Sequence, residues 1–132
     1  MIFIDSNVPM YLVGADHPNK ELSRSALSRL VANAEVLVTD AEVLQEILHR
    51  YVAIDRRAAI DDAMTAILGI VDEVFAIERT DVVRAQDILV DSLLSARDAL
   101  HVAVMRRHGV DRVLTFDTGF DSAPDLVRLP ET

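Results

Sequence analysis

The sequence predicts an α/β fold in which helices cover both faces of a central parallel sheet. Short apolar runs alternate along the chain with longer segments of helical periodicity, which is the pattern of βαβ crossovers. The chain has 132 residues, 51% of them hydrophobic, enough for one core of ordinary size. No linker, repeat or low-complexity stretch divides it, so we expect a single domain over residues 1–132.

The first half of the chain begins with a strand that ends in an acid. Residues 1–5 read MIFID, an apolar run of the kind found in buried strands. Pro9 falls in the first turn of the next segment, where a helix tolerates proline. Apolar residues at helical spacing predict the longer helices downstream. The elements expected in this half are strands at 1–5 and 36–38 and helices at 7–14, 18–33, 40–54 and 58–71.

The second half continues the alternation. Gly109 is well placed to end the last long helix, because glycine readily adopts the left-handed conformation found just after many helices. The run RVLTF at 112–116 reads as a strand. The elements expected in this half are strands at 74–77, 112–116 and 126–129 and helices at 80–93 and 95–108.

Composition excludes several classes of protein. The chain has no cysteine, which rules out disulfides, thiolate zinc sites and a cysteine nucleophile. No apolar run approaches the roughly 18–20 residues that span a bilayer, and no basic stretch precedes the apolar N-terminus. We therefore expect a cytoplasmic protein without a membrane partner. The net charge of −9 argues against an ordinary basic nucleic-acid binder, and leaves bound metal cations or local arginine patches as routes to nucleic acid.

Two acids are expected at the edge of the sheet where ligands bind. Asp5 closes the first strand and Asp117 follows the strand that ends at Phe116. In open α/β sheets the functional crevice lies at the carboxyl ends of the strands. Each acid also has a structural explanation: Asp5 could help cap the next helix, and Asp117 could form an Asx turn with Gly119. The sequence leaves both readings open.

The helix over 40–54 contributes a third candidate. Thr39 and Glu42 have the spacing of a capping box, which gives Glu42 a structural role at the helix start. Glu46 has no such role and lies on the flank of the apolar face that includes Val43. A surface pair with Arg50 is the structural alternative. We favour a functional role for Glu46.

Asp98 is the fourth candidate, in the first turn of the helix over 95–108. Ser95 is placed to cap this helix, and the stretch 99–105 is apolar nearly all round, so the helix should be buried. A buried carboxylate is costly unless it is paired or binds a metal. His101, three residues on, has a spacing compatible with a shared metal. A lone histidine in an apolar helix is more often a core residue whose hydrogen bonds are satisfied, and we favour that interpretation.

At these positions the chain resembles the PIN-domain nucleases, specifically the VapC toxins of bacterial toxin–antitoxin pairs. Each matching motif is short, but their order and spacing extend over essentially the whole chain. The matching stretches are Phe3-Ile4-Asp5-Ser6-Asn7, Val43-Leu44-Gln45-Glu46-Ile47-Leu48, Ala96-Arg97-Asp98-Ala99-Leu100-His101-Val102-Ala103 and Leu114-Thr115-Phe116-Asp117-Thr118-Gly119-Phe120.

The resemblance implies a three-layer α/β/α PIN-like domain and endonucleolytic cleavage of RNA with Mg²⁺ or Mn²⁺. It also implies a cognate VapB-type antitoxin and a second copy of the chain, as a homodimer, as partners. Ser6 matches a small hydroxyl residue that supports the site, Asn7 fits the opening motif, and Asp121 is either an auxiliary acid or a competitor for the role of Asp117. The acids that match the family's site are Asp5, Glu46, Asp98 and Asp117.

Clustered carboxylates explain why such a site needs a cation. Acids packed within a few ångströms repel one another, so some must be protonated or a cation must lie among them. Oxygen ligands favour Mg²⁺ or Mn²⁺ over zinc, and a bound ion can activate water for in-line attack on a phosphodiester. We expect Asp5 and Asp98 to be direct ligands, with Glu46 and Asp117 binding directly or through water. Arg97 is the arginine best placed to contact phosphate, unless it pairs with a carboxylate such as that of Glu46.

Three other functions are weighed against this one. A catalytically silent PIN-like module that binds RNA or a partner is disfavoured because all four acids are retained. A phosphohydrolase with Asp5 as nucleophile lacks a second acid two residues on, where Asn7 stands. A nucleotide-binding domain lacks a glycine-rich loop after the first strand, and the chain has only four glycines.

Overall fold

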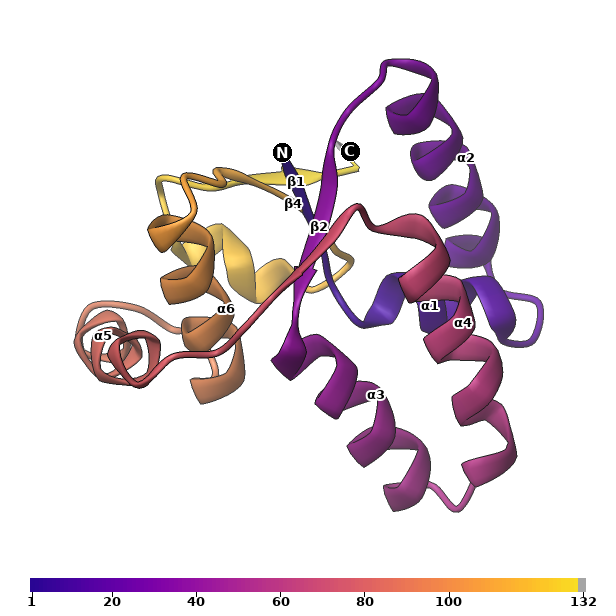
Figure 1. The fold of residues 1–132 in the computed structure, drawn as a ribbon, viewed down its shortest axis with the longest axis horizontal. Helices are drawn as coiled ribbons and strands as arrows, with labels where there is room; N and C mark the ends of the chain where they lie inside the picture. The colour runs from indigo at the N-terminus through magenta and orange to yellow at the C-terminus, as the bar shows by residue number, and fades with distance from the viewer. Residues whose placement is uncertain (131–132) are drawn as a thin grey trace.

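The computed structural model describes residues 1–130, which form a parallel sheet of five strands with helices on both sides (Figure 1). The expected fold class is confirmed, and each expected helix and strand is present close to its expected position. The strands are β1 (Ile2–Ile4), β2 (Leu37–Asp40), β3 (Glu73–Phe75), β4 (Arg112–Leu114) and β5 (Val127–Leu129). The helices are α1 (Asn7–Val13), α2 (Pro18–Ala32), α3 (Ala41–Ala53), α4 (Ile60–Ile70), α5 (Arg79–Val90) and α6 (Ala96–Arg107), with short 3₁₀ turns at Arg57–Ala59 and Thr118–Ser122.

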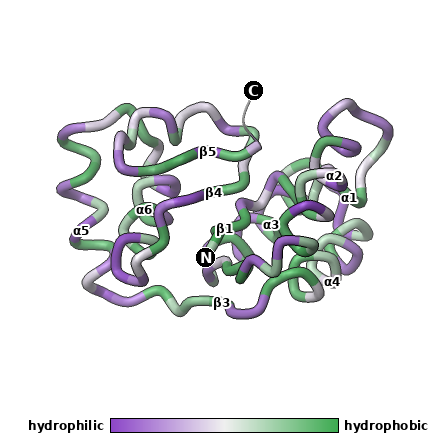
Figure 2. Tube along the Cα trace, turned by 90° about the horizontal axis from the view of Figure 1, so that it is seen from above, coloured by the Kyte–Doolittle hydropathy of each residue, from purple (hydrophilic) through white to green (hydrophobic). Residues whose placement is uncertain are grey.

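The helices form two separate layers. Helices α1 to α4 lie on one side of the sheet and α5 and α6 on the other, in both views (Figures 1 and 2). Figure 2 shows hydrophobic and hydrophilic residues alternating along the helices, as expected for elements with one face on a core and the other in water. Among residues 1–130, no helix has the length and apolar character that crossing a bilayer requires.

Strand order determines which side chains meet at the carboxyl edge of the sheet. The order is β3-β2-β1-β4-β5 and all neighbours are parallel, so β1 is central, with β2 and β4 beside it. All three residues of β1 are completely buried, as a strand covered on both faces should be. In the register of β1 and β4, Ile4 faces Leu114, so the next residues, Asp5 and Thr115, follow side by side.

The start of α3 differs from the expected capping box. Asp40 caps the helix, and its Oδ1 accepts a hydrogen bond from the Val43 N–H at 2.9 Å. The Thr39 hydroxyl instead donates to the Ile4 carbonyl at 2.8 Å. The capping role assigned to Thr39 and Glu42 is therefore wrong, because β2 continues through Asp40 and the helix begins one residue later than the motif suggests.

The boundaries of α6 agree with the sequence. The Ser95 hydroxyl accepts a hydrogen bond from the Asp98 N–H at 3.1 Å and so caps the helix. Gly109 follows the C-cap with a φ of +69°, the left-handed conformation that favours glycine.

A buried ion pair joins α5 to α6. Asp81 is completely buried and accepts hydrogen bonds from Arg107 Nε at 2.8 Å and Nη2 at 2.9 Å. Its Oδ2 also accepts from the Glu78 N–H at 2.8 Å, which caps α5. The hydrogen bonds hold the pKa of Asp81 below its ordinary value despite burial, which by itself would raise that pKa. Asp81 thus depends on Arg107 to remain charged inside the protein.

We expect Arg107→Ala to lower the Tm by about 5 °C or more, because it leaves a buried carboxylate without its cation. Arg106→Ala is the matched control, since the adjacent Arg106 pairs with Asp125 at 2.7 Å between side chains that are 43% and 48% exposed. An exposed pair contributes little, so the control should lose no more than about 2 °C. Equal losses in a thermal melt of the two variants would contradict the role of the buried pair.

Candidate active site

Asp5 lies at the carboxyl end of β1 and is held by hydrogen bonds on both of its oxygens. Its side chain is almost fully buried. Oδ1 accepts from the Ser6 N–H at 2.8 Å, and Oδ2 accepts from the Thr115 hydroxyl at 2.7 Å and from Asn7 Nδ2 at 3.4 Å. These bonds fix the orientation of the carboxylate before any ligand binds.

Thr115 is a supporting residue to which the sequence analysis assigned no role. Its Oγ1 accepts from Asn7 Nδ2 at 3.0 Å and from the Asp117 N–H at 3.1 Å. Because a hydroxyl has one proton and both lone pairs are used, that proton is directed at Asp5. Asn7 also accepts from the Phe116 N–H at 3.3 Å, which ties the β4 end to the start of α1.

Glu46 reaches the same edge of the sheet from α3. Its Oε1 accepts a hydrogen bond from the Ser6 hydroxyl, and its Oε2 lies 3.2 Å from Arg97 Nη1. Arg97 Nε also lies 3.3 Å from Glu42, so one guanidinium holds two acids of α3. The pairing of Arg97 with Glu46, left open by the sequence, is therefore present. The alternative partner of Glu46, Arg50, is not its ion-pair partner here.

Asp98 faces Asp117 across the site. Burial, the facing Asp117 carboxyl and the negative charge of Asp5 raise the pKa of Asp98 to about 7. Burial is also the largest cause of a raised pKa at Asp5, where Glu46 raises it further while His101 and the Thr115 hydroxyl lower it. These shifts arise from crowded like charges with little access to water.

Asp117 lies in the lining of the cleft, whereas Asp121 lies outside it. Asp117 lines the cleft, and its Oδ1 accepts from the Gly119 N–H at 2.8 Å, so it makes the Asx turn as well as facing the site. A Cβ on residue 119 would lie 3.0 Å from that oxygen, which explains the glycine. Asp121 pairs with Arg128 at 2.9 Å and lies outside the lining of the cleft. The geometry favours Asp117 as the fourth acid.

A buried histidine–aspartate pair lies behind the acids. His101 Nδ1 is 2.8 Å from Asp40 Oδ2, and both side chains are 0% exposed. Burial alone would lower the pKa of His101, but the hydrogen bond to Asp40 and the charges of Asp40, Asp5 and Glu46 raise it to about 9. Asp40 was not predicted as a partner of His101, because the two residues are 61 positions apart in the chain.

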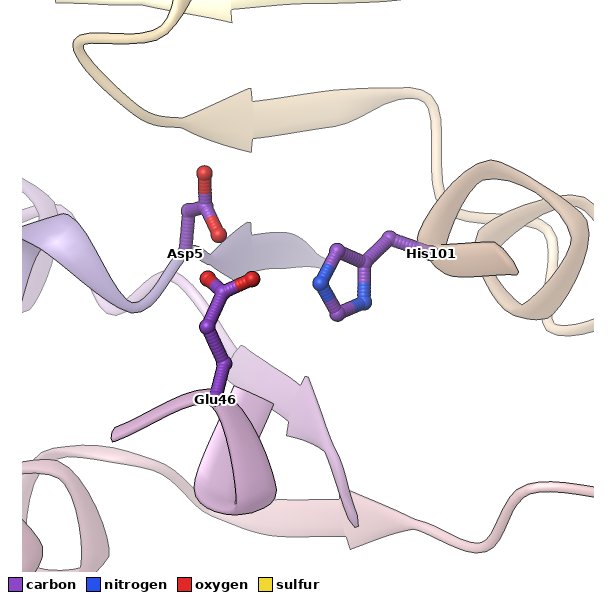
Figure 3. A group of neighbouring side chains, drawn as sticks. All are labelled: Asp5, Glu46 and His101. Carbon is purple, nitrogen blue, oxygen red and sulfur yellow. The ribbon is translucent and has the colours of Figure 1, made fainter. Parts of the chain in front are cut away.

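The four acids expected from the sequence line one open cleft of about 1200 Å³. They come from different elements: the end of β1, α3, the start of α6 and the segment after β4. Figure 3 shows Asp5, Glu46 and His101 converging, and each offers one ligand atom within 4.8 Å of the others. Burial and the neighbouring acids raise the pKa of Asp98, so the protein alone disfavours the charged form of this carboxyl group. A divalent cation fits this donor set.

Comparison with known proteins agrees with this geometry. The family model described as "PIN domain" matches residues 2–126. The chain therefore belongs to the PIN-domain family, as its motifs indicated.

Individual relatives narrow the assignment to the VapC ribonucleases. The chain is 59% identical to ribonuclease VapC13 of Mycobacterium tuberculosis over 130 residues, which is 98% of this chain and 99% of the relative. It is 40% identical to ribonuclease VapC23 of the same species over 124 residues, which is 93% of this chain and 98% of the relative. Within the PIN-domain family, the chain belongs with these VapC proteins.

Solved structures share the fold. Mycobacterium tuberculosis VapC20, described as a Sarcin-Ricin loop cleaving toxin, superposes with a TM-score of 0.75 at 25% identity, over 93% of this chain and 95% of that one. VapBC2 from Rickettsia felis, bound to a DNA fragment from its promoter, gives a TM-score of 0.74 at 13% identity, over 97% of both chains.

The pKa shifts predict that the metal-free protein loses stability as the pH rises. Asp5, Asp98 and His101 all have raised pKa values, so each contributes stability while it is protonated in the folded state. For Asp98 that contribution is lost between its ordinary pKa of 3.8 and about 7, and for His101 between 6.5 and about 9. In EDTA, the Tm should therefore fall steadily from pH 5 to pH 9.

The variant Asp98→Asn isolates the contribution of Asp98. It should reduce the fall between pH 5 and pH 7, where Asp5 still contributes, and leave the fall above pH 7, where His101 loses its proton. The lowered pKa values of Glu35, Asp81 and Asp125 act mainly below about pH 5, at the lower end of this range. A metal-free Tm that is constant or rises over this range would contradict the repulsion among the acids.

Proposed function

We propose that the chain is a Mg²⁺-dependent endoribonuclease, formed as one nuclease domain over residues 1–132, that acts as the toxin of a type II toxin–antitoxin pair. The observation that carries this proposal is the meeting of Asp5, Glu46, Asp98 and Asp117 in one cleft at the carboxyl edge of the sheet. The 59% identity to a relative named ribonuclease VapC13 supports RNA as the substrate.

The burial of each acid suggests how it would bind the metal ion. Asp5 and Asp98, both nearly buried, would bind Mg²⁺ or Mn²⁺ directly. Glu46 and the exposed Asp117 would bind it directly or through water. When bound, the ion would lower the pKa of a water molecule and offset charge on the phosphodiester.

The protein's own contribution is to position these groups. Ser6, Asn7 and Thr115 hold Asp5 in one orientation through the hydrogen bonds described above. Arg97 fixes Glu46 and keeps its side chain 36% exposed in the lining of the cleft, where a guanidinium can bind a phosphate oxygen.

Two protein partners are part of the proposal, an antitoxin and a second copy of the chain. We propose that the cleft is closed by a VapB-type antitoxin and that the chain forms a homodimer in the cytoplasm. Support for the antitoxin partner comes from the structural neighbours, which include VapBC2 from Rickettsia felis and a toxin–antitoxin complex from Klebsiella pneumoniae.

We expect Asp5→Asn to lower RNA cleavage by about 100-fold or more, because it removes charge from the ligand set. Asp121→Asn is the matched control, since that acid lies outside the cleft and pairs with Arg128; it should stay within about twofold of wild type. EDTA should abolish cleavage, and Mg²⁺ or Mn²⁺ should restore it. The measurement is sequencing of RNA ends after incubation of total RNA with each protein.

Wild-type cleavage by the Asp5 variant would remove Asp5 from the mechanism. Absence of cleavage by the wild type with either ion, on total RNA and on a sarcin–ricin loop oligonucleotide, would favour a silent binding module.

The product of the adjacent upstream reading frame should co-purify with the chain and stop RNA cleavage, because an antitoxin must block the acidic cleft. The measurement is cleavage of the same RNA by the free chain and by the purified complex, at equal toxin concentration. An unchanged rate in the complex would count against inhibition by occlusion of the site.

A further inference from the structure

We propose that His101 Nε2 is a nitrogen ligand of the metal ion in this cleft, beside Asp5 and Glu46, and that Asp40 orients the imidazole for this role. The inference rests on the metal dependence proposed above and specifies which atoms bind the ion. It also predicts that the site prefers Mn²⁺ to Mg²⁺.

The first observation is an unpaired buried atom. His101 is completely buried, and its Nδ1 is already engaged by Asp40. Its Nε2 has no hydrogen-bond partner among the described residues and no access to water. Buried polar atoms in folded proteins are nearly always satisfied, so an unpaired one calls for a ligand.

The second observation is the direction in which that atom points. Figure 3 shows one ring nitrogen of His101 turned toward the carboxylates of Asp5 and Glu46 and the other turned away. Because Nδ1 binds Asp40, the nitrogen facing the acids is Nε2. The three side chains come from β1, α3 and α6, so the fold itself brings them together.

The spacing suits a shared cation better than a direct hydrogen bond. One ligand atom from each residue lies within 4.8 Å of the other two. Small cations bind oxygen and nitrogen at about 2.0–2.2 Å, so two ligands of one ion are at most about 4.4 Å apart. The group therefore needs only a slight closure around an ion.

Asp40 supplies the support that a ligating histidine needs. Metal-bound imidazoles usually donate their other N–H to a carboxylate, a backbone carbonyl or water, which fixes the tautomer and the ring orientation. Here Asp40 Oδ2 faces His101 Nδ1, while Oδ1 is held by the Val43 N–H at 2.9 Å. The ring of Phe3, with its centroid 5.3 Å from that of His101, limits its rotation further.

A nitrogen ligand changes the metal preference of the site. Mg²⁺ favours an all-oxygen environment, whereas imidazole suits transition metals, so the proposed set should bind Mn²⁺ at least about 10-fold more tightly than Mg²⁺. The alternative role for His101 is that of a buried cation that only balances the acids. In that case Nε2 would keep its proton and no metal–nitrogen bond would form.

Pulsed EPR of Mn²⁺ bound to the full-length protein tests the bond directly and without RNA. We expect nitrogen modulation from one imidazole, with a frequency that changes when histidine is labelled with ¹⁵N. The matched variant is His49→Gln, which removes the histidine that lines the cleft in the described structure. The labelled signal should survive in this variant, and it should vanish in His101→Gln, whose Mn²⁺ affinity should fall by about 10–100-fold.

The outcomes separate this inference from the proposed function. Mn²⁺ binding without nitrogen coupling, or a coupling lost in His49→Gln, would overturn the role of His101 while leaving metal-dependent cleavage intact. Failure of the wild-type protein to bind Mn²⁺ would overturn both. The His49 comparison does not depend on whether His101→Gln folds, because it retains the buried pair.

Discussion

Repulsion among carboxylates at one edge of the sheet is the constraint on which the rest of this structure depends. A parallel sheet brings the ends of β1, β2 and β4 together, and the chain places Asp5 and Asp40 at two of them. Asp98 and Glu46 add two more acids from helices that begin at the same edge. Burial, together with the facing Asp117 carboxyl and the charge of Asp5, raises the pKa of Asp98 to about 7. The side chains around these acids pair with them and so reduce this repulsion.

Helix α6 supplies three of these side chains within its first two turns. Arg97 pairs with Glu46, and His101 pairs with Asp40. Asp98, between them, is itself one of the site acids. Ser95 caps the start of the helix, which fixes where these three side chains begin relative to the carboxyl edge of the sheet. The buried side of the cluster therefore contains an imidazole and the open side a guanidinium.

The sequence was sufficient to predict the site residues that are marked by the residues next to them in the chain. The four acids were recognisable because each one follows a strand, flanks an apolar face or enters a buried helix. The Asp40–His101 pair was not, because it joins residues 61 positions apart and because Asp40 was read as part of a capping box. That error followed from a small shift of boundary: β2 runs through Asp40, which turns its side chain toward α6. Thr115 was missed for a similar reason, since its role depends on the register of β1 with β4.

The exposure of the site side chains rises from one end of the cluster to the other, and this order bears on how an acidic protein can approach RNA. His101 is 0% exposed, Asp5 is 3% and Asp98 7% exposed, and the Glu46 side chain is 16% exposed, while Asp117 is open to solvent. The least exposed side chains therefore lie on the inner side of the cluster, away from the open side at which RNA would arrive. Arg97, at 36% exposure, stands at the open side beside Asp98. A chain with a net charge of −9 thus keeps its most concentrated negative charge beneath this open side, where a cation would be held.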